Sequence, residues 1–202
     1  MIASIREFWY MWLILAALIA VAVWAGIKAS KAVKKRGAIM RSQREELERY
    51  QFLFEKYSCL TREKAEIADA KELAEGVTAV LQKELEKSPD PDGTFKNAEK
   101  WRREVYALYY FDEDCKESLS YFFKRNEKPL PDEAVNGLES IGEAKLRSLS
   151  AAMWSMYDEQ NENVSLDSVR AGELDKKFKE IYDQTEFFEK IKNYIIEMVS
   201  LQ

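Results

Sequence analysis

One stretch of the sequence comes near to the pattern of a metal site, the segment SPDPDGTFKNAE. A calcium-binding EF-hand loop has oxygen ligands at positions 1, 3 and 5, glycine at position 6 and glutamate at position 12. Asp90 and Asp92 take positions 3 and 5 here. Gly93 and Glu99 take positions 6 and 12. Position 1 is Ser88, however, and a lysine stands at position 9. We therefore expect an interhelix turn without metal, and keep calcium binding by Asp90, Asp92 and Glu99 as the alternative.

Three successive carboxylates form a candidate interaction patch, the run Asp112-Glu113-Asp114. Such a run is also typical of a solvated loop or of a helix start, where carboxylates favour the positive end of the helix dipole. Six aromatic residues nearby are candidates for a binding groove, although their helical spacing favours a place in a core. They are Tyr106, Tyr109, Tyr110, Tyr121, Phe122 and Phe123.

Catalysis finds little support in the residue types. The chain has no histidine, which removes the commonest general base and metal ligand. Its two cysteines, Cys59 and Cys115, have no metal-ligand spacing and fit structural thiols in a reducing compartment. No phosphate loop or nucleophile elbow is present in the sequence. We predict a non-enzyme without catalytic residues or cofactors, and an enzyme that uses only carboxylates or a metal remains the alternative.

The N-terminal part has the pattern of a transmembrane helix. Residues 8–27 read FWYMWLILAALIAVAVWAGI, of which nineteen are apolar and the other is a glycine. Twenty residues at about 1.5 Å rise span about 30 Å, the thickness of the hydrocarbon core of a bilayer. The aromatic and basic residues that flank this span predict the membrane interface, since such side chains prefer the headgroup level. They are Trp9, Trp12, Trp24, Lys28, Lys31, Lys34, Lys35 and Arg36.

Charge predicts both the orientation of the chain and its partners. Residues 1–44 carry a net charge of +7, with the basic residues concentrated after the apolar span, and residues 45–202 carry −12. Basic residues that flank a span stay in the cytoplasm, so we expect the N-terminus outside and the rest of the chain cytoplasmic. The basic segment should contact anionic membrane lipid. The acidic part should repel nucleic acid and attract a protein with a basic surface.

Helical spacing recurs after the span, and only seven glycines and four prolines interrupt the chain. We predict an all-α protein, in which a single transmembrane helix precedes a cytosolic domain of about six or seven helices. The predicted divisions are an anchor at 1–30, a basic segment and neck helix at 31–60, and a soluble domain at 61–202.

Some helix boundaries can be assigned from the same spacing. The neck has a heptad-like pattern at Met40, Leu47, Tyr50, Phe54 and Tyr57. One helix should run from near Thr61 to about residue 85, where prolines and an Asp-Gly pair stop it. Gly142 should end a helix in a left-handed conformation. Asp183 should break the C-terminal segment into two helices, since a glutamate follows three residues later as in a capping box.

Residues 99–198 resemble the helical domain family that includes the neisserial DNA-mimic protein. The similar segments are Val105-Tyr106-Ala107-Leu108, Tyr121-Phe122-Phe123 with Asn126, Pro131-Asp132-Glu133-Ala134-Val135-Asn136-Gly137-Leu138-Glu139-Ser140-Ile141-Gly142, and Leu174-Asp175-Lys176-Lys177-Phe178 followed by Tyr194-Ile195. The resemblance covers about half of the chain and implies an all-helical fold. It also implies a protein partner, because the DNA mimic presents carboxylates in place of phosphates to a transcription factor.

One segment departs from that family. The family usually has an Asn-Gly-Gly-Phe-type segment with a glutamine before the aromatic pair, and here Cys115-Lys116-Glu117-Ser118-Leu119-Ser120 stands in its place. A family site built by that segment would be absent from this chain. Most members of the family have no known activity, so the resemblance bears on the fold more than on the function. The sequence thus predicts a membrane-anchored, non-enzymatic protein-interaction module, and a structural component of an envelope assembly is a further alternative.

Overall fold

The computed structural model describes residues 40, 41, 43–157 and 168–201. The chain divides into two compact units, Met1–Arg49 and Tyr50–Gln202. The predicted membrane span at 8–27 and the eight predicted interface residues lie outside the described residues. Within the described ranges, no helix is both long enough and apolar enough to cross a membrane.

The described part of the first unit is a short helical stretch. Residues 40, 41 and 43–49 are helical. The Arg44 guanidinium pairs with the Glu48 carboxylate one turn later, at 2.8 Å between Nε and Oε1. Met40 and Leu47 of the predicted neck are exposed.

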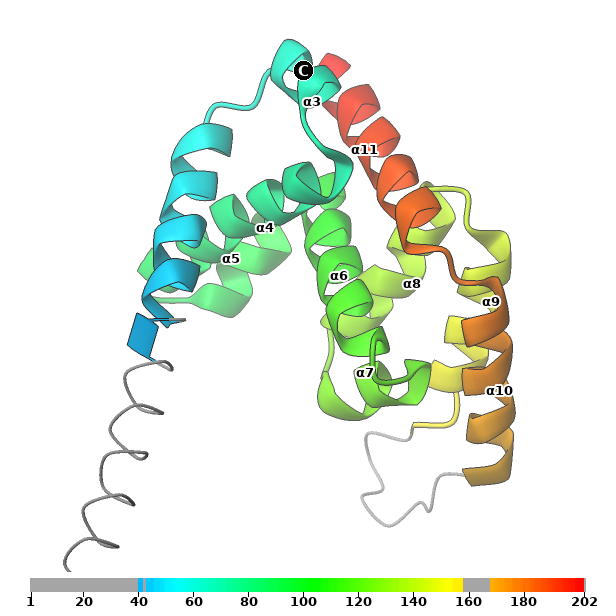
Figure 1. Ribbon diagram of the computed structural model, residues 1–202. Helices are drawn as coiled ribbons and strands as arrows, with labels where there is room; N and C mark the ends of the chain where they lie inside the picture. The colour runs from blue at the N-terminus through cyan, green and yellow to red at the C-terminus, as the bar shows by residue number, and fades with distance from the viewer. Residues whose placement is uncertain (1–39, 42, 158–167, 202) are drawn as a thin grey trace, which may run out of the picture. The chain divides into compact units, whose positions relative to one another are not determined.

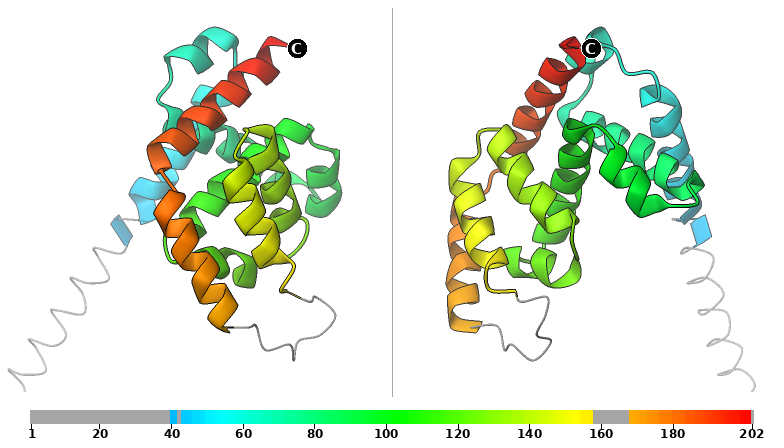
Figure 2. Two further views of the ribbon diagram at one scale, coloured as in Figure 1. Left: turned by 90° about the vertical axis from the view of Figure 1, so that its right-hand side faces the viewer. Right: turned by 180° about the vertical axis from the view of Figure 1, so that it is seen from behind.

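The second unit is helical in all of its described elements, which confirms the all-α class for this part of the chain (Figures 1 and 2). Residues 50–57 are helical and precede nine further helices. These are α3 (Arg62–Ile67), α4 (Ala70–Lys87), α5 (Pro91–Asn97), α6 (Lys100–Cys115), α7 (Leu119–Arg125), α8 (Leu130–Ser140), α9 (Ala144–Trp154), α10 (Ser168–Ile181) and α11 (Gln184–Ser200).

The described helices exceed the six or seven that the sequence predicts, because one predicted helix is divided into α3 and α4 and a predicted turn contains α5. The predicted single helix from Thr61 to residue 85 is wrong. It breaks at Ala68, where the backbone is extended, and the Asp69 carboxylate then caps α4 by accepting the Glu72 N–H at 3.0 Å. The turn expected after residue 88 likewise contains the short helix α5. Helix-capping side chains therefore divide the chain more finely than its apolar periodicity indicates.

Two of the predicted boundaries are confirmed. Gly142 follows α8 with a φ of +76°, the left-handed conformation that glycine adopts without steric cost. Asp183 separates α10 from α11, and its carboxylate accepts the N–H groups of Thr185 and Glu186 at 2.9 and 3.0 Å. These two caps end α8 and begin α11, both of which pack against α6.

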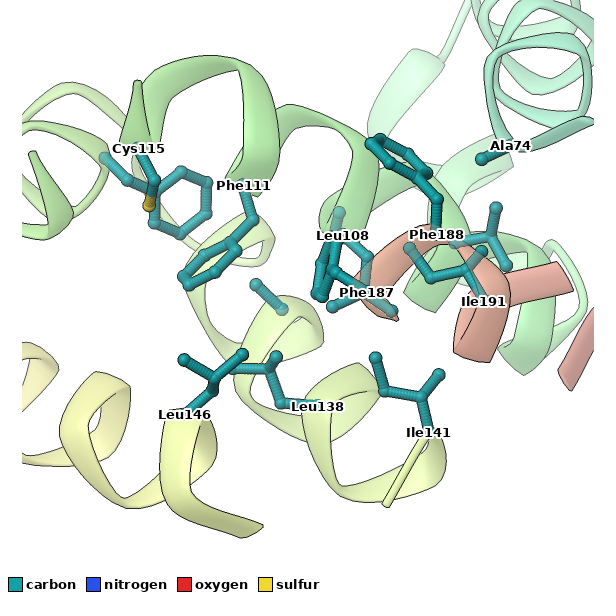
Figure 3. Packing of buried hydrophobic residues seen from close by; sticks show 14 of the residues in the cluster. Ala74, Leu108, Phe111, Cys115, Leu138, Ile141, Leu146, Phe187, Phe188 and Ile191 are labelled. Carbon is teal, nitrogen blue, oxygen red and sulfur yellow. The ribbon is translucent and has the colours of Figure 1, made fainter. Parts of the chain in front are cut away.

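The core of the second unit surrounds α6, where side chains from α6, α8 and α11 converge (Figure 3). Phe111 of α6 lies at its centre. Its ring centroid is 5.2 Å from that of Phe122, 5.8 Å from that of Phe178 and 6.2 Å from that of Phe187. Aromatic pairs at these distances are favourable beyond the area they bury. Helix α6 is therefore the element against which α7, α10 and α11 are positioned.

The N-terminal boundary of this unit lies at Tyr50, whereas the predicted soluble domain covers residues 61–202. Leu53 and Tyr57 are buried in the core cluster, and the Tyr50 hydroxyl donates to the Ala79 carbonyl oxygen at 3.1 Å. The ring of Tyr57 lies so close to Gly76 that a Cβ at this position would overlap Cδ2 of the ring. The second half of the predicted neck is thus part of the packed domain.

Candidate functional site

An apolar pocket of about 410 Å³ lies among α4, α5, α6 and the start of α8. Its apolar lining includes Leu85, Phe95, Tyr106 and Leu130, one from each of these four helices. The volume falls in the range typical of small-molecule sites, which are mostly apolar and carry a few polar groups. We refer to this cavity as the α5 pocket, and it is the candidate functional site.

Local hydrogen bonds shape helix α5. Asp90 caps it, because Oδ1 accepts the Gly93 N–H at 3.0 Å, and Pro91 occupies the first turn, where no N–H is needed. The Ser88 hydroxyl lies 2.7 Å from the Thr94 hydroxyl and donates to the Asp90 carbonyl oxygen at 2.9 Å. A Cβ at Gly93 would overlap Asp90 Oδ2, so a side chain at this position would displace the capping carboxylate. The cap fixes the start of the helix that carries Phe95.

Arg103 of α6 fixes the other end of α5. One guanidinium nitrogen donates to the carbonyl oxygens of Lys96 and Ala98 at 3.0 and 2.6 Å. Its Nε donates to the Glu133 carboxylate of α8 at 2.8 Å. Hydrogen bonds that involve a charged group are stronger than neutral ones, and this pair is partly buried. One side chain therefore links three of the helices that surround the α5 pocket.

The aromatic wall of the α5 pocket is formed by Phe95 and Tyr106. Their ring centroids lie 5.6 Å apart with the rings at 66°, and the Tyr106 hydroxyl donates to Gln82 Oε1 at 2.8 Å. The Tyr110 hydroxyl donates to the same oxygen at 3.3 Å. Burial raises the pKa of Tyr106 well above the ordinary tyrosine value, so its hydroxyl stays neutral even at alkaline pH. The wall thus offers apolar ring surface rather than an ionised phenol.

The charged lining of the α5 pocket consists of Asp92, Lys96 and Lys128. All three side chains are exposed. Lys96 forms no ion pair with any residue in the described ranges, and Lys128 Nζ lies 5.8 Å from the ring centroid of Trp154. Two cations and one anion therefore give this pocket a net positive lining in an acidic unit.

The EF-hand-like residues have other roles in this fold. Asp90 caps α5, Asp92 lies in the first turn of α5, and Glu99 occupies the position before α6. Within the ranges that the structure describes, no group of three or more acidic or cysteine side chains could hold a metal ion. The sequence of residues 88–99 resembles an EF-hand loop, but this segment forms the capped helix α5.

The three carboxylates of the acidic run do not share one exposed face, because three successive helical residues point in different directions. Asp112 is 1% exposed, and its carboxylate accepts the Tyr182 hydroxyl at 2.5 Å and the Gln184 side-chain amide at 2.9 Å to each oxygen. Asp114 is also buried and accepts the Asn126 side-chain amide at 2.7 Å. Only Glu113 is partly exposed. The candidate patch of three carboxylates is therefore corrected. The alternative of a solvated loop or a helix start is corrected as well, because the three residues lie at the C-terminal end of α6 and two of them are buried.

Glu104 is a buried carboxylate that is absent from the predicted site residues. It is fully buried on α6 and accepts the Tyr194 hydroxyl at 2.5 Å and the Ser140 hydroxyl at 3.1 Å, while Lys100 Nζ lies 3.4 Å away. A signal was present in the sequence, because Glu104 stands four residues before Leu108, on the same apolar stripe of the helix. Glu104 and Asp112 each bind a C-terminal tyrosine and so attach α11 and the end of α10 to α6.

The six candidate groove aromatics are divided between core and surface. Phe122 and Phe123 are buried, Tyr106, Tyr109 and Tyr110 are half-buried, and Tyr121 is 38% exposed. Only Tyr106 of the six lines the α5 pocket. The helical spacing thus predicts burial correctly for the two phenylalanines, and the groove that the structure contains uses Phe95 instead.

A second cavity, of about 510 Å³, collects carboxylates near the start of α11. Glu143 and Glu186 both pair with Lys190 Nζ, at 2.6 and 2.7 Å, and Asp183 caps α11. A smaller cavity of about 230 Å³ is lined by Trp101 and by the ion pair of Arg102 with Glu84 at 2.8 Å. Three of these carboxylates, those of Glu143, Glu186 and Glu84, therefore already pair with a cation. The fourth, that of Asp183, caps a helix.

Searches against protein-family models, curated proteins and solved structures found no match to this chain. The resemblance to the DNA-mimic family therefore stays a prediction.

Proposed function

We propose that this chain is a membrane-anchored, non-enzymatic protein-interaction module. In this proposal, residues 8–27 are the anchor, the N-terminus is outside, and the acidic helical unit lies at the cytoplasmic face. Its partner is a protein with a basic surface, and the basic residues after the anchor contact anionic lipid. Tethering raises the effective concentration of the unit for partners at the membrane without any new contact.

The observation that carries this proposal is the charge asymmetry of the chain. Residues 1–44 have a net charge of +7 and residues 45–202 one of −12. A charge difference of this size steers the two parts toward different surfaces, because each attracts the opposite sign and repels its own. Electrostatic complementarity of this kind acts mainly on the association rate and on the choice of partner.

The distribution of carboxylates supports a binding surface over a catalytic site. Seven exposed glutamates form no ion pair within the described ranges, and they are spread over several segments of the unit. They are Glu63, Glu117, Glu127, Glu173, Glu180, Glu189 and Glu197. The carboxylates that line the 510 Å³ cavity, by contrast, are engaged by Lys190 or by the cap of α11. Free negative charge therefore lies on the outer surface.

A pull-down in mild detergent tests the binding part of the proposal. The intact chain and a fragment of residues 45–202 should retain the same basic partner, with binding that weakens as salt rises because surface charges are screened. Changing Glu173, Glu180, Glu189 and Glu197 together to glutamine should reduce capture. The control changes Lys176, Lys177 and Lys179 on α10 to glutamine, which should leave capture undiminished. A fragment without any partner, together with substrate turnover or a bound metal, would favour the enzyme alternative.

Protease added to intact cells tests the topology. The acidic unit should stay uncut until the membrane is permeabilised, because the proposal places residues 28–202 in the cytoplasm. Digestion of the unit in intact cells would contradict the orientation.

A further inference from the structure

We propose that the α5 pocket binds a small amphipathic anion, a molecule with an apolar ring or short chain that carries one carboxylate. This site is additional to the exposed glutamates of the proposed function, and it has a lining of the opposite charge. The inference depends on the shape of the pocket, on its aromatic wall and on the sign of its charged lining.

The pocket has the size and surface of a small-molecule site. Its volume of about 410 Å³ accommodates a compact ligand. Leu85, Phe95, Tyr106 and Leu130 offer an apolar lining that excludes water from a ring or chain. The ring of Tyr106 is held at its hydroxyl by Gln82, which keeps its face in place.

The charged lining selects the anionic end of the ligand. Lys96 and Lys128 both line the pocket, and Lys96 has no ion-pair partner within the described ranges. Lys128 Nζ also lies 5.8 Å from the ring centroid of Trp154, which is not a lining residue. Asp92 brings one negative charge to the same pocket. The two ammonium groups together favour a carboxylate, and the Asp92 carboxylate opposes it. The sign of each contribution can therefore be tested separately.

The pocket is fixed before any ligand arrives. The Asp90 cap fixes the start of α5, and the Arg103 side chain fixes its end to α6 and α8. A site whose walls are already held loses little conformational entropy on binding. The α5 pocket thus meets the requirements of a preorganised site for a small ligand.

The test uses 4-benzoylbenzoate, a photoreactive aromatic carboxylate, with the full-length chain. Illumination joins the probe to nearby C–H bonds, and mass spectrometry of the digested protein locates the labelled peptides. Saturable labelling is expected on the segments that contain Leu85, Phe95 and Leu130. The matched neutral probe, 4-benzoylbenzamide, should label the same segments several-fold less at equal concentration.

Three variants separate charge recognition from general apolar binding. The double change Lys96→Gln with Lys128→Gln should weaken labelling by the carboxylate about five- to tenfold and leave labelling by the amide unchanged. Asp92→Asn should strengthen labelling by the carboxylate. Lys177→Gln on α10, remote in sequence from every lining residue of the pocket, is the matched control and should change neither. Unchanged helical circular dichroism identifies variants that still fold.

The proposal fails under several distinct outcomes. Labelling that is spread over the whole unit, or equal for the two probes, would show that the pocket does not recognise an anion. Unchanged labelling of the double lysine variant, or weaker labelling of Asp92→Asn, would show that the charged lining has no such role.

Discussion

Replacing Tyr182 by phenylalanine removes one donor from a buried carboxylate without changing the ring. Asp112 is 1% exposed and accepts the Tyr182 hydroxyl at 2.5 Å. After the change it keeps the Gln184 amide at 2.9 Å and Lys71 Nζ at 3.7 Å. A hydrogen bond to a charged group contributes about 1.5–3 kcal/mol, so the free energy of unfolding should fall by this amount. The stacking of residue 182 on Phe178 should survive, because the two ring centroids lie 4.9 Å apart and the hydroxyl takes no part in it.

The measurement is urea unfolding of residues 45–202, followed by circular dichroism. Tyr121→Phe is the matched control, since the Tyr121 hydroxyl accepts from Arg125 at 3.2 Å on an exposed surface. The control should change the free energy of unfolding by less than about 0.5 kcal/mol. Equal effects of the two changes would refute the reasoning, because burial of the carboxylate would then make no difference.

The stabilisation by the Tyr182 hydroxyl should depend on pH. Burial, together with the hydrogen bond to Asp112, raises the pKa of Tyr182 above its ordinary value. The unfolded chain loses this proton near pH 10, whereas the folded chain keeps it to higher pH. The stabilisation is therefore complete below about pH 10 and is lost as pH rises above it, by up to about 1.4 kcal/mol per pH unit. The difference between the unmodified fragment and Tyr182→Phe should shrink above pH 10, and a difference that stays constant to pH 11 would contradict this assignment.

Two further predictions concern glycine and cysteine positions. Gly76→Ala should lower the free energy of unfolding by about 1–3 kcal/mol, because its Cβ would overlap the ring of Tyr57. Gly172→Ala has open space around its Cβ and should raise the free energy of unfolding by about 0.5–1 kcal/mol. Urea unfolding measures both changes. Cys59 is exposed, whereas Cys115 is buried and burial raises the pKa of its thiol. Iodoacetamide should therefore modify only Cys59 until urea unfolds the chain. Mass spectrometry of the treated protein would detect this difference.

The helices and several of their ends could be predicted from the sequence, because apolar spacing and capping residues are local signals. Asp183 and Gly142 mark their boundaries through their own side-chain chemistry or backbone conformation. The break at Ala68 was missed, since the apolar pattern continues through it and only Asp69 signals a new start. Local patterns thus predict where helices form better than they predict where helices break.

The candidate site was less predictable, because it depends on contacts between residues far apart in the sequence. The α5 pocket joins Leu85, Phe95, Tyr106 and Leu130, whose proximity follows from the packing of four helices. The buried state of Asp112 follows from partners at Tyr182 and Gln184, about 70 residues later. Neither arrangement leaves a fixed spacing in the sequence, so the acidic run alone indicated a solvated loop, a helix start or an exposed patch.

The attachment of α11 to α3, α4 and α6 has a consequence for synthesis of the chain. Phe187, Phe188, Ile191 and Ile195 belong to the core, and Lys192 donates to the Ala68 carbonyl oxygen across 124 residues of sequence. The ribosome therefore releases the last part of this core only after α11 has been synthesised, when the complementary surfaces of the earlier helices have already emerged. Folding of this unit cannot be completed before α11 is synthesised, and a nascent chain that stalls before residue 184 exposes apolar surface to chaperones and proteases.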